Sequence, residues 1–393
     1  MSRTLTKPRI KNILEGACFM ASGGGGSLPI AFKMLESCPN TSVELYSANE
    51  LLPNDKVIVV AGLGAPTAVN ANTFADILEN TFDCYKANAK IYNPDQNIAG
   101  VISVEYGGLN TLAPIYLAMK NSNVKLVDAD GTGRAVPGLD TIFLSLNGIS
   151  LSPLALASSN GSNAFIKTHD ITDTPFYESL VRATVSNPFF GPIIGIGAWE
   201  MDKNTVMEKS LVGALTKAEL IGKVIERFRN GELKYDGIFQ AIEKELSGKL
   251  GFPANEGFVK ELGHNSRLTY VGNLKSYSGF DATRYDICCG NTSQPTHSIL
   301  NFNESLVIID LATNTAISTA PDIICIFDDN EKVPLTNDVI EKNKEKYLNT
   351  PVSIGIIRVS EKWNQFNADE INKIWSPYFD KLDYKDGCVF YPF

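Results

Sequence analysis

The sequence predicts an α/β protein: a doubly wound, mostly parallel sheet in the N-terminal domain, and an α+β, β-rich C-terminal domain. Three observations indicate this class. In the first third, short apolar runs each lead into a loop and then a helical pattern. A cluster of turn residues at 159–163 marks a change in the hydrophobic pattern, and short runs of alternating or continuous apolar residues dominate at 265–330. Apolar runs that are each followed by a helix are typical of parallel strands covered on both faces.

The first third supplies three predicted strands and the helices between them. Strands are expected at Lys56–Ala61, Gly100–Glu105 and Val124–Val127, and helices at Thr73–Lys86 and Leu109–Lys120. Right-handed crossovers place the C-terminal ends of parallel strands at one edge of a sheet. We therefore expect the loops after these three strands to lie together.

Beyond the turn cluster the pattern is more irregular. It predicts a helix at Pro175–Ser186, a strand at Pro192–Ala198 and a helix at Lys217–Arg229. Thr216 and Glu219 have the spacing of a capping box, which would begin the second helix at residue 217.

Length and composition indicate two folded domains, which we place at 1–170 and 171–393. The chain has 393 residues, 44% of them hydrophobic and 20% charged. A net charge of −9 argues against nucleic acid or an anionic membrane as a partner. No apolar stretch approaches the roughly 18 residues that a spanning helix needs, and no secretory signal is recognisable. We expect a cytoplasmic protein with a small-molecule ligand, and a homo-oligomer is an open option.

The first candidate site is a run of glycines before a predicted helix. Its residues are Gly23, Gly24, Gly25, Gly26 and Ser27. Glycines let the backbone approach a ligand closely, and N–H groups at a helix N-terminus point at an anion or a developing oxyanion. Ser27 is also expected to cap the helix. No lysine follows, so this is not a nucleotide phosphate loop. The alternative is a tight turn between packed helices.

A second glycine motif follows the first predicted strand. Gly62-Leu63-Gly64 resembles the start of a dinucleotide fingerprint, but Thr67 stands where the third glycine belongs. We therefore expect no nucleotide cofactor.

Three carboxylates form the strongest positional cluster. Glu105, Asp128 and Asp130 fall at or just after the ends of predicted strands, where open α/β sheets bind ligands. Carboxylates held together repel one another, so at least one pKa should rise and place an acid beside a base. Arg134 could neutralise them or hold a substrate carbonyl. The alternative is that they are solvated loop charges and helix caps.

Cysteine and histidine carry a weaker signal. The odd number of cysteines, seven, argues against a fully paired set. Cys288, Cys289 and His297 could suggest a metal site, but adjacent thiols cannot easily share one tetrahedral ion. We favour a structural or incidental role for them, and no serine or cysteine triad is indicated.

At these motifs the sequence resembles the S-methyl thiohydantoin desulfurase family. The matching N-terminal segments are 23–26, Gly64-Ala65-Pro66, Glu105-Tyr106-Gly107-Gly108-Leu109-Asn110 and 127–137. Asn303-Glu304 and Ala320-Pro321-Asp322 resemble the C-terminal domain of that family. Members often carry an acidic residue after the glycine run, where this chain has Ser27.

The resemblance implies attack of water on an S-methylated thiohydantoin ring, with oxygen replacing the methylthio group. Glu105 or Asp128 would be the base, Asp130 its acid or orienting partner, and Arg134 with the glycine amides the electrophilic stabilisers. The expected substrate-binding set adds Gly64, Gly107, Gly108 and Asn110 to the glycine run and Ser27.

Three alternatives stay open. A divalent metal held by the carboxylates could activate the water instead of a base. The chain could instead be a metabolite-binding or accessory subunit beside a hydantoinase-type enzyme. It could also be an anion- or nucleotide-dependent enzyme that uses the glycine loop.

Overall fold

The structure, a computed structural model, describes residues 2–64, 69–168, 173–185, 187–249, 252–254, 257–277, 280–290 and 292–393. The motif residues Ala65, Pro66 and Thr67 lie outside these ranges. Contacts within the chain divide it into two compact units. The first holds Met1–Lys11 and Gly26–Thr216, and the second holds Asn12–Gly25 and Lys217–Phe393. No helix in the described ranges combines the length and hydrophobicity needed to cross a membrane.

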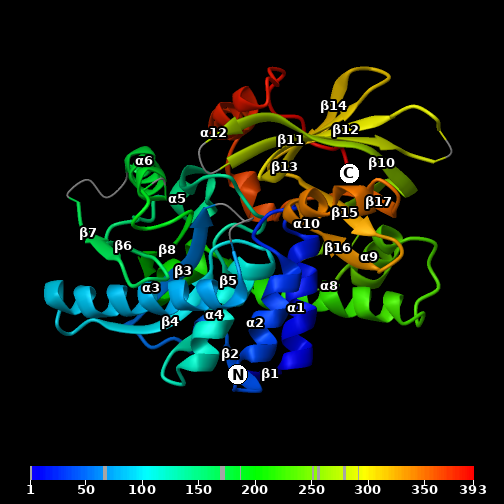
Figure 1. The fold of residues 1–393 in the computed structure, drawn as a ribbon. Helices are drawn as coiled ribbons and strands as arrows, with labels where there is room; N and C mark the ends of the chain where they lie inside the picture. Colours follow the sequence, from blue (N-terminus) through cyan, green and yellow to red (C-terminus); the bar gives the residue numbers. More distant parts are fainter. Residues whose placement is uncertain are drawn as a thin grey trace. The chain divides into compact units, whose positions relative to one another are not determined.

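The described residues of the first unit form a nine-stranded sheet in the order β1-β2-β5-β4-β3-β8-β6-β7, with β9 beside β5. Figure 1 labels strands β1 to β8 of this sheet. The strands are β1 (Arg3–Thr6), β2 (Ser42–Tyr46), β3 (Asp55–Gly64), β4 (Asn97–Ser103), β5 (Lys125–Asp130), β6 (Leu154–Ala157), β7 (Asn163–Ile166), β8 (Ile193–Met201) and β9 (Leu211–Val212).

The centre of this sheet is parallel. β2, β5, β4 and β3 pair in parallel, while β1, β8, β6 and β7 add antiparallel pairs at the two sides. The predicted α/β class is confirmed, and the three expected strands correspond to β3, β4 and β5. The apolar stretch 57–61 in β3 is buried, as expected for a strand in the middle of a covered sheet.

Helices connect the parallel strands. α3 contacts β3, β6 and β8, and α4 contacts β3 and β4, so each packs on the strand that it follows and on other strands of the same sheet. The helices that lie wholly or partly in this unit are α1 (Lys7–Phe19), α2 (Leu28–Ser37), α3 (Ala71–Tyr92), α4 (Gly108–Lys120), α5 (Phe143–Leu146), α6 (Thr174–Val185), α7 (Lys203–Lys209) and α8 (Ala214–Arg229), with short 3-10 turns at η1 (Ala48–Glu50) and η3 (Leu139–Thr141).

The expected domain boundary near residue 170 does not coincide with an edge of this sheet. β8 lies between β3 and β6 and pairs antiparallel with both, and β9 pairs with β5, so the sheet continues to residue 212. In addition, the segment 12–25 belongs to the second unit although it precedes most of the first. Hydrophobic patterning identifies a strand but not the sheet that it joins.

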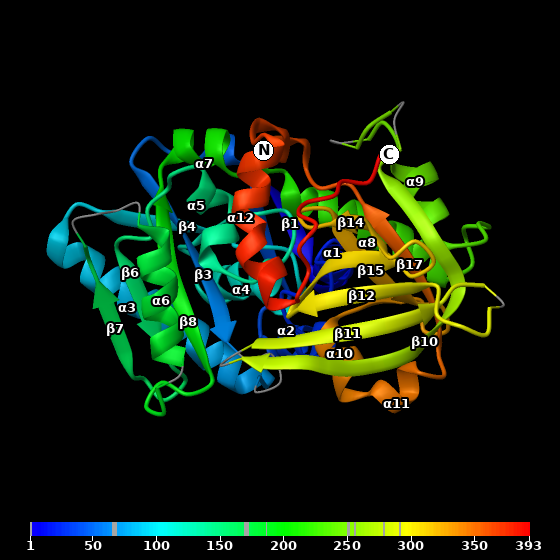
Figure 2. The same ribbon diagram turned by 90° about the horizontal axis from the view of Figure 1, so that it is seen from above.

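The second unit is built on an eight-stranded antiparallel sheet, counted over its described residues, in the order β14-β13-β12-β11-β10-β17-β15-β16. Figure 2 shows β10, β11 and β12 side by side. The strands are β10 (Val259–Tyr277), β11 (Phe280–Cys288), β12 (His297–Phe302), β13 (Glu304–Asp310), β14 (Thr315–Thr319), β15 (Ile323–Asp328), β16 (Val333–Leu335) and β17 (Pro351–Ile357).

The predicted β-rich C-terminal region is confirmed by this sheet. Alternate positions such as Tyr285 and Ile287 on β11 point into one apolar core with Ile299, Ile308 and Ile354. The helices of this unit beyond α8 are α9 (Ile238–Leu246), α10 (Asn337–Lys342), α11 (Lys344–Tyr347) and α12 (Ala368–Lys381), with a 3-10 turn at η4 (Glu361–Gln365).

Candidate active site

Glu105 lies in the loop between β4 and α4 and is 7% exposed. Its Oε1 accepts a hydrogen bond of 2.7 Å from the side-chain amide of Asn110, in the first turn of α4. Its Oε2 accepts one of 2.9 Å from the backbone N–H of Val136. The carboxylate is therefore fixed by the start of a helix on one side and by the segment after β5 on the other.

Asn110 connects this carboxylate to the neighbouring strand. Its Oδ1 accepts a hydrogen bond of 3.0 Å from the N–H of Gly62 on β3, while its Nδ2 donates to Glu105. The ends of β3 and β4 therefore share one polar network, as the rule for parallel strands leads us to expect.

Asp130 is the last residue of β5 and is fully buried. Its Oδ1 accepts hydrogen bonds from the N–H groups of Thr132 (2.8 Å) and Gly133 (2.6 Å). Its Oδ2 has no hydrogen-bond partner among the described residues. Ser103 pairs with Asp130 across the sheet and donates its hydroxyl to the backbone carbonyl of Glu105 at 2.9 Å.

Burial shapes the acidity of both groups. It raises the pKa of Glu105 to about 7, against the lowering effect of the Asn110 and Val136 hydrogen bonds, and the charge of Asp130 raises it further. Burial also raises the pKa of Asp130 to about 6, opposed by the N–H groups of Thr132 and Gly133. The two carboxyls influence one another, so they titrate as a pair near neutral pH. Such a pair offers a proton donor beside a proton acceptor.

Arg134 is fully buried in the loop that follows Asp130. Its Nε donates a hydrogen bond of 2.9 Å to the carbonyl of Ala135. Its positive charge lowers the pKa of Glu105, although less than burial raises it. The structure thus brings Glu105, Asp130 and Arg134 into one electrostatic neighbourhood.

Asp128 accepts its hydrogen bonds from a different part of the chain, the start of α8. Its Oδ1 accepts hydrogen bonds from the N–H groups of Leu215 (2.9 Å) and Thr216 (3.2 Å), and its Oδ2 accepts one from the Thr216 hydroxyl. These contacts stabilise the first turn of α8, where unpaired N–H groups need acceptors. Asp128 therefore acts as a helix cap, which was the alternative interpretation of the three carboxylates. The predicted capping box is wrong, because α8 begins at Ala214 and Thr216 lies inside it.

The carboxylates do not fit a divalent metal. Five of the six oxygens of Glu105, Asp128 and Asp130 already accept hydrogen bonds from protein donors, Asp130 Oδ2 being the exception. A hard cation needs several carboxylate oxygens directed at one point. Within the described ranges, no three His, Cys, Asp or Glu side chains have that arrangement.

The glycines at the start of α2 and α4 allow the two helix N-termini to meet. The N–H of Gly108 donates to the carbonyl of Gly26 at 3.1 Å. A Cβ on Gly26 would lie 2.7 Å from Leu109 Cβ, and one on Gly108 would lie 2.8 Å from the Gly26 carbonyl oxygen. Close packing therefore explains both glycines. Gly107, whose N–H donates to the Thr111 hydroxyl at 3.1 Å, occupies the N-cap position of α4.

Ser27 is the N-cap residue of α2, as expected, but its side chain makes no capping hydrogen bond there. The N–H groups of Gly26 and Ser27 have no acceptor within the described part of the chain. These two donors, beside Gly108 and the loop that carries Glu105, suit a group that bears negative charge.

The other glycines of the run belong to the second unit. The carbonyl of Gly23 accepts a hydrogen bond of 2.8 Å from the N–H of Asn337, and a Cβ on Gly23 would lie 2.5 Å from Asn337 Oδ1. Gly24 donates to the carbonyl of Ala21 at 3.1 Å, and Gly24 and Gly25 are buried. Gly23 therefore lies in a tight, packed turn, which was the alternative interpretation of the glycine run. Gly64 likewise has little room, since a Cβ there would lie 2.3 Å from the Pro192 carbonyl oxygen.

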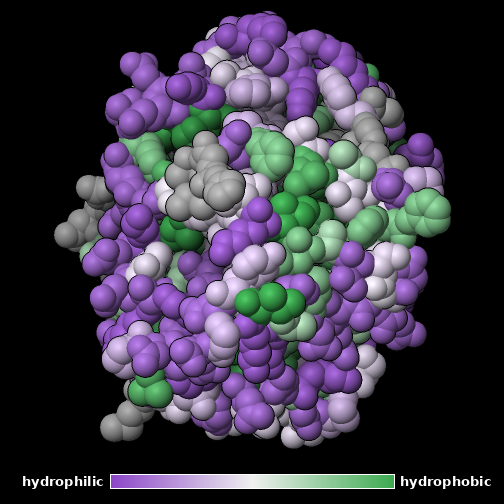
Figure 3. Space-filling view, turned by 90° about the vertical axis from the view of Figure 1, so that its left-hand side faces the viewer, coloured by the Kyte–Doolittle hydropathy of each residue, from purple (hydrophilic) through white to green (hydrophobic). Residues whose placement is uncertain are grey.

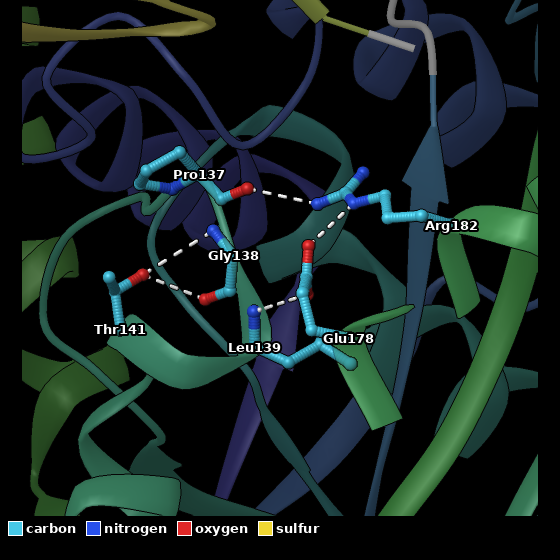
Figure 4. A network of polar contacts seen from close by, with 6 residues as sticks. All are labelled: Pro137, Gly138, Leu139, Thr141, Glu178 and Arg182. Atoms are coloured by element: carbon cyan, nitrogen blue, oxygen red, sulfur yellow. Dashed lines mark hydrogen bonds and ion pairs between the residues drawn. The ribbon is translucent and has the colours of Figure 1, made fainter. Parts of the chain in front are cut away.

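A network beyond the predicted residues holds the segment after Arg134 (Figure 4). Arg182 on α6 donates to the carbonyl of Pro137 at 2.9 Å and pairs with Glu178 at 2.6 Å. Glu178 in turn accepts the N–H of Leu139 at 2.9 Å. Sequence reasoning missed these residues and the Val136 N–H, because nothing in their spacing connects α6 with a loop about forty positions earlier.

Two family models match the chain. The model described as "S-Me-THD-like, N-terminal domain" matches residues 8–168, and "S-Me-THD-like, C-terminal domain" matches residues 172–385. A crystal structure of a protein from Chromobacterium violaceum is similar over 99% of each chain, with a TM-score of 0.74 and 21% sequence identity, which shows a shared fold. None of the curated proteins compared with the chain matches it.

Proposed function

Because the chain belongs to the S-Me-THD-like family, we propose that it is an enzyme that hydrolyses an S-methyl thiohydantoin to the hydantoin and methanethiol. The resemblance seen in the sequence motifs is confirmed by the two family models. The observation that carries the proposal is the pair of buried carboxyls, Glu105 and Asp130, whose pKa values rise to about 7 and about 6. General acid–base catalysis needs groups poised near the working pH.

In the proposed reaction, the oxygen of water attacks the ring carbon that carries the methylthio group. Ionised Glu105 takes a proton from this water, and electron density moves onto the ring nitrogen. The N–H groups of Gly26 and Ser27 and the charge of Arg134 stabilise that density. The carbon–sulfur bond then breaks, and protonated Glu105 returns the proton to the departing methanethiolate. The sum is substrate plus water giving hydantoin plus methanethiol.

We assign Asp130 a positioning role instead of contact with the substrate. It is fully buried, and its charge raises the pKa of Glu105. This effect keeps Glu105 able to hold a proton at neutral pH. Asp128 is not needed in this scheme, because Glu105 supplies the base and Asp128 stabilises the first turn of α8.

A second candidate is a metabolite-binding or accessory subunit of a hydantoinase-type enzyme. It is favoured by the near-complete burial of Glu105 and by the hydrogen bonds that already occupy both of its oxygens. In either case we propose a small-molecule ligand in a cytoplasmic protein. A homo-oligomer or a hydantoinase-type partner also belongs to the proposal.

The deciding experiment incubates the purified chain with an S-methyl thiohydantoin and measures methanethiol by gas chromatography. We expect release by the wild type and a loss of at least about a hundredfold in Glu105→Gln, the usual effect of removing a general base. Asp95→Asn, an exposed carboxylate between α3 and β4, is the control and should keep full activity.

Thermal-shift measurements with hydantoins and with nucleotides separate the alternatives. Stabilisation by hydantoins without methanethiol release would favour the accessory subunit. Stabilisation by nucleotides alone would favour the anion-dependent enzyme. If the wild type neither releases methanethiol nor binds hydantoins, the proposed function is wrong.

A further inference from the structure

A cysteine and a histidine meet at the β11–β12 hairpin of the second unit. Cys288 ends β11 and is buried, whereas Cys289 follows it and is partly exposed. His297 begins β12, and its Nδ1 lies 3.3 Å from the Sγ of Cys289. A Cβ on Gly263 would lie 2.6 Å from this sulfur, so a glycine at this position avoids a steric clash with the thiol.

Thr296 contacts both members of this pair. Its hydroxyl oxygen accepts the N–H of Cys289 at 3.0 Å, and its hydroxyl can donate to the carbonyl of Ile287 at 3.2 Å. His297 Nδ1 lies 2.8 Å from the same hydroxyl oxygen. When the Thr296 hydroxyl donates to Ile287, the Nδ1 proton of a protonated imidazole can point toward Thr296 and Cys289. That is the arrangement of an imidazolium beside a thiolate.

The electrostatics agree with this geometry. Burial by itself would raise the pKa of Cys289, but hydrogen bonds from His297, Thr296 and Ser266 outweigh it and lower the pKa. The hydrogen bond to Cys289 raises the pKa of His297 against the effect of burial, and the charge of Asp310 raises it further. A thiol beside a cationic histidine reacts as thiolate over a wider pH range than an ordinary cysteine.

His297 also lines an open hollow of about 690 Å³. Its walls include Thr292, Gln294 and Pro295 from the β11–β12 loop, and Asp310 and Leu311 at the end of β13. A volume of this size accepts a small organic molecule. Most of its lining residues have polar side chains, while apolar atoms form the larger part of the exposed wall.

We propose that Cys289 and His297 form a reactive thiolate–imidazolium pair, and that Cys289, which is partly exposed and contacts two residues of this hollow, is a site of reversible S-thiolation by low-molecular-weight disulfides. The Sγ of Cys289 attacks one sulfur of the small disulfide, a new sulfur–sulfur bond forms, and the other half leaves as a thiolate. The protein thiol is oxidised to a mixed disulfide while the leaving half is reduced. A second small thiol reverses the step.

The chain contains a matched control. Cys388 is also partly exposed, but burial raises its pKa to about 12. The remaining cysteines, Cys18, Cys38, Cys84, Cys288 and Cys325, are buried. Exposure alone would let Cys289 and Cys388 react alike, whereas activation by His297 favours Cys289.

The test treats the folded full chain with dithionitrobenzoate and with glutathione disulfide, and locates adducts by peptide mass spectrometry. We expect one fast thiol per chain with both reagents, at Cys289, which disappears in Cys289→Ser and persists in Cys388→Ser. His297→Asn should slow the fast phase by about tenfold or more near pH 6.5, because one pKa unit changes the thiolate fraction about tenfold. The rate should then rise steeply with pH, as for an ordinary thiol.

Three results would overturn the proposal: labelling of Cys289 no faster than of Cys388, an unchanged rate in His297→Asn, or reaction with dithionitrobenzoate but not with glutathione disulfide. Circular dichroism and melting curves of each variant establish that it is folded. If His297→Asn does not fold, the pH profile of the wild-type rate replaces it. A rate that follows an ordinary thiol pKa would then contradict the pair.

Discussion

At the scale of single residues, three carboxylates close together in the sequence receive different surroundings. Both oxygens of Asp128 accept hydrogen bonds from the start of α8, Glu105 accepts from Asn110 and Val136, and Asp130 accepts from the loop that follows it. Burial raises the pKa of all three carboxyls. The positions of these residues at strand ends were predictable, because parallel strands end at one edge of a sheet. Their roles were not, since the donors at Val136, Thr132 and Leu215 are peptide groups that residue type does not reveal.

The first residue-scale prediction concerns Asp130→Asn. Removing this charge should lower the pKa of Glu105, because Asp130 raises it. The pH profile of methanethiol release should therefore shift toward lower pH. The loss at the optimum should stay below the roughly hundredfold expected for a general base, and Asn can still accept from Thr132 and Gly133. A profile that falls in height without shifting would show that Asp130 acts only on structure.

At the scale of elements, the predicted strands β3, β4 and β5 are where the apolar runs placed them, but the glycine run has more than one role. Gly26 and Gly108 permit contact between α2 and α4, and Gly23 packs on Asn337. The sequence could not separate these uses, because a glycine needed for packing looks the same as one needed for a ligand.

Gly26→Ala tests the packing role against a matched control. Gly26 and Gly161 both have φ of +86°, but a Cβ on Gly161 meets nothing within 4 Å. Alanine at 161 should cost only the strain of a left-handed backbone, about 1–2 kcal/mol. Alanine at 26 should cost about 1–3 kcal/mol more through overpacking against Leu109. Urea unfolding measures both, and equal losses would remove the packing explanation.

A second element-scale prediction concerns the contact between α6 and the loop after Arg134. Arg182→Gln should remove the charged donor to the Pro137 carbonyl and the ion pair with Glu178. That loop carries Val136, whose N–H donates to Glu105 and lowers its pKa. Weakening this hydrogen bond should raise the pKa of Glu105, and the pH profile of methanethiol release should shift toward higher pH. Arg182→Lys should restore part of the wild-type profile. A change in melting temperature alone would limit Arg182 to a structural role.

At the scale of the whole molecule, the chain passes between its two units at residues 11–12, 25–26 and 216–217. The family models divide it once, between residues 168 and 172. Composition could reveal two domains but not that segment 12–25 joins the second, since an apolar helix face does not specify its partner. Hydrophilic residues cover most of the face in Figure 3, with smaller hydrophobic areas between them.

The stability of the first unit should fall as pH rises through the range of its buried acids. Glu105 has a pKa near 4.5 when unfolded and about 7 when folded, so the folded state binds more protons between these values. Stability is then greatest below about pH 4.5 for this group and is lost as pH rises through 7. A shift of about 2.5 units corresponds to roughly 3 kcal/mol.

Trp199, fully buried in the first unit, is the natural probe for this effect. With Trp363 and Trp375 replaced by Phe, denaturant unfolding followed by Trp199 fluorescence reports on this unit. Glu105→Gln should flatten the decline of unfolding free energy between about pH 5 and pH 7.5, by up to roughly 3 kcal/mol. Losing a hydrogen bond to Asn110 or Val136 lowers the unfolding free energy equally at every pH. The slope of the unfolding free energy against pH therefore reports only the titration of Glu105. Asp95→Asn should leave the slope unchanged, and parallel curves for wild type and Glu105→Gln would mean that Glu105 does not carry a raised pKa.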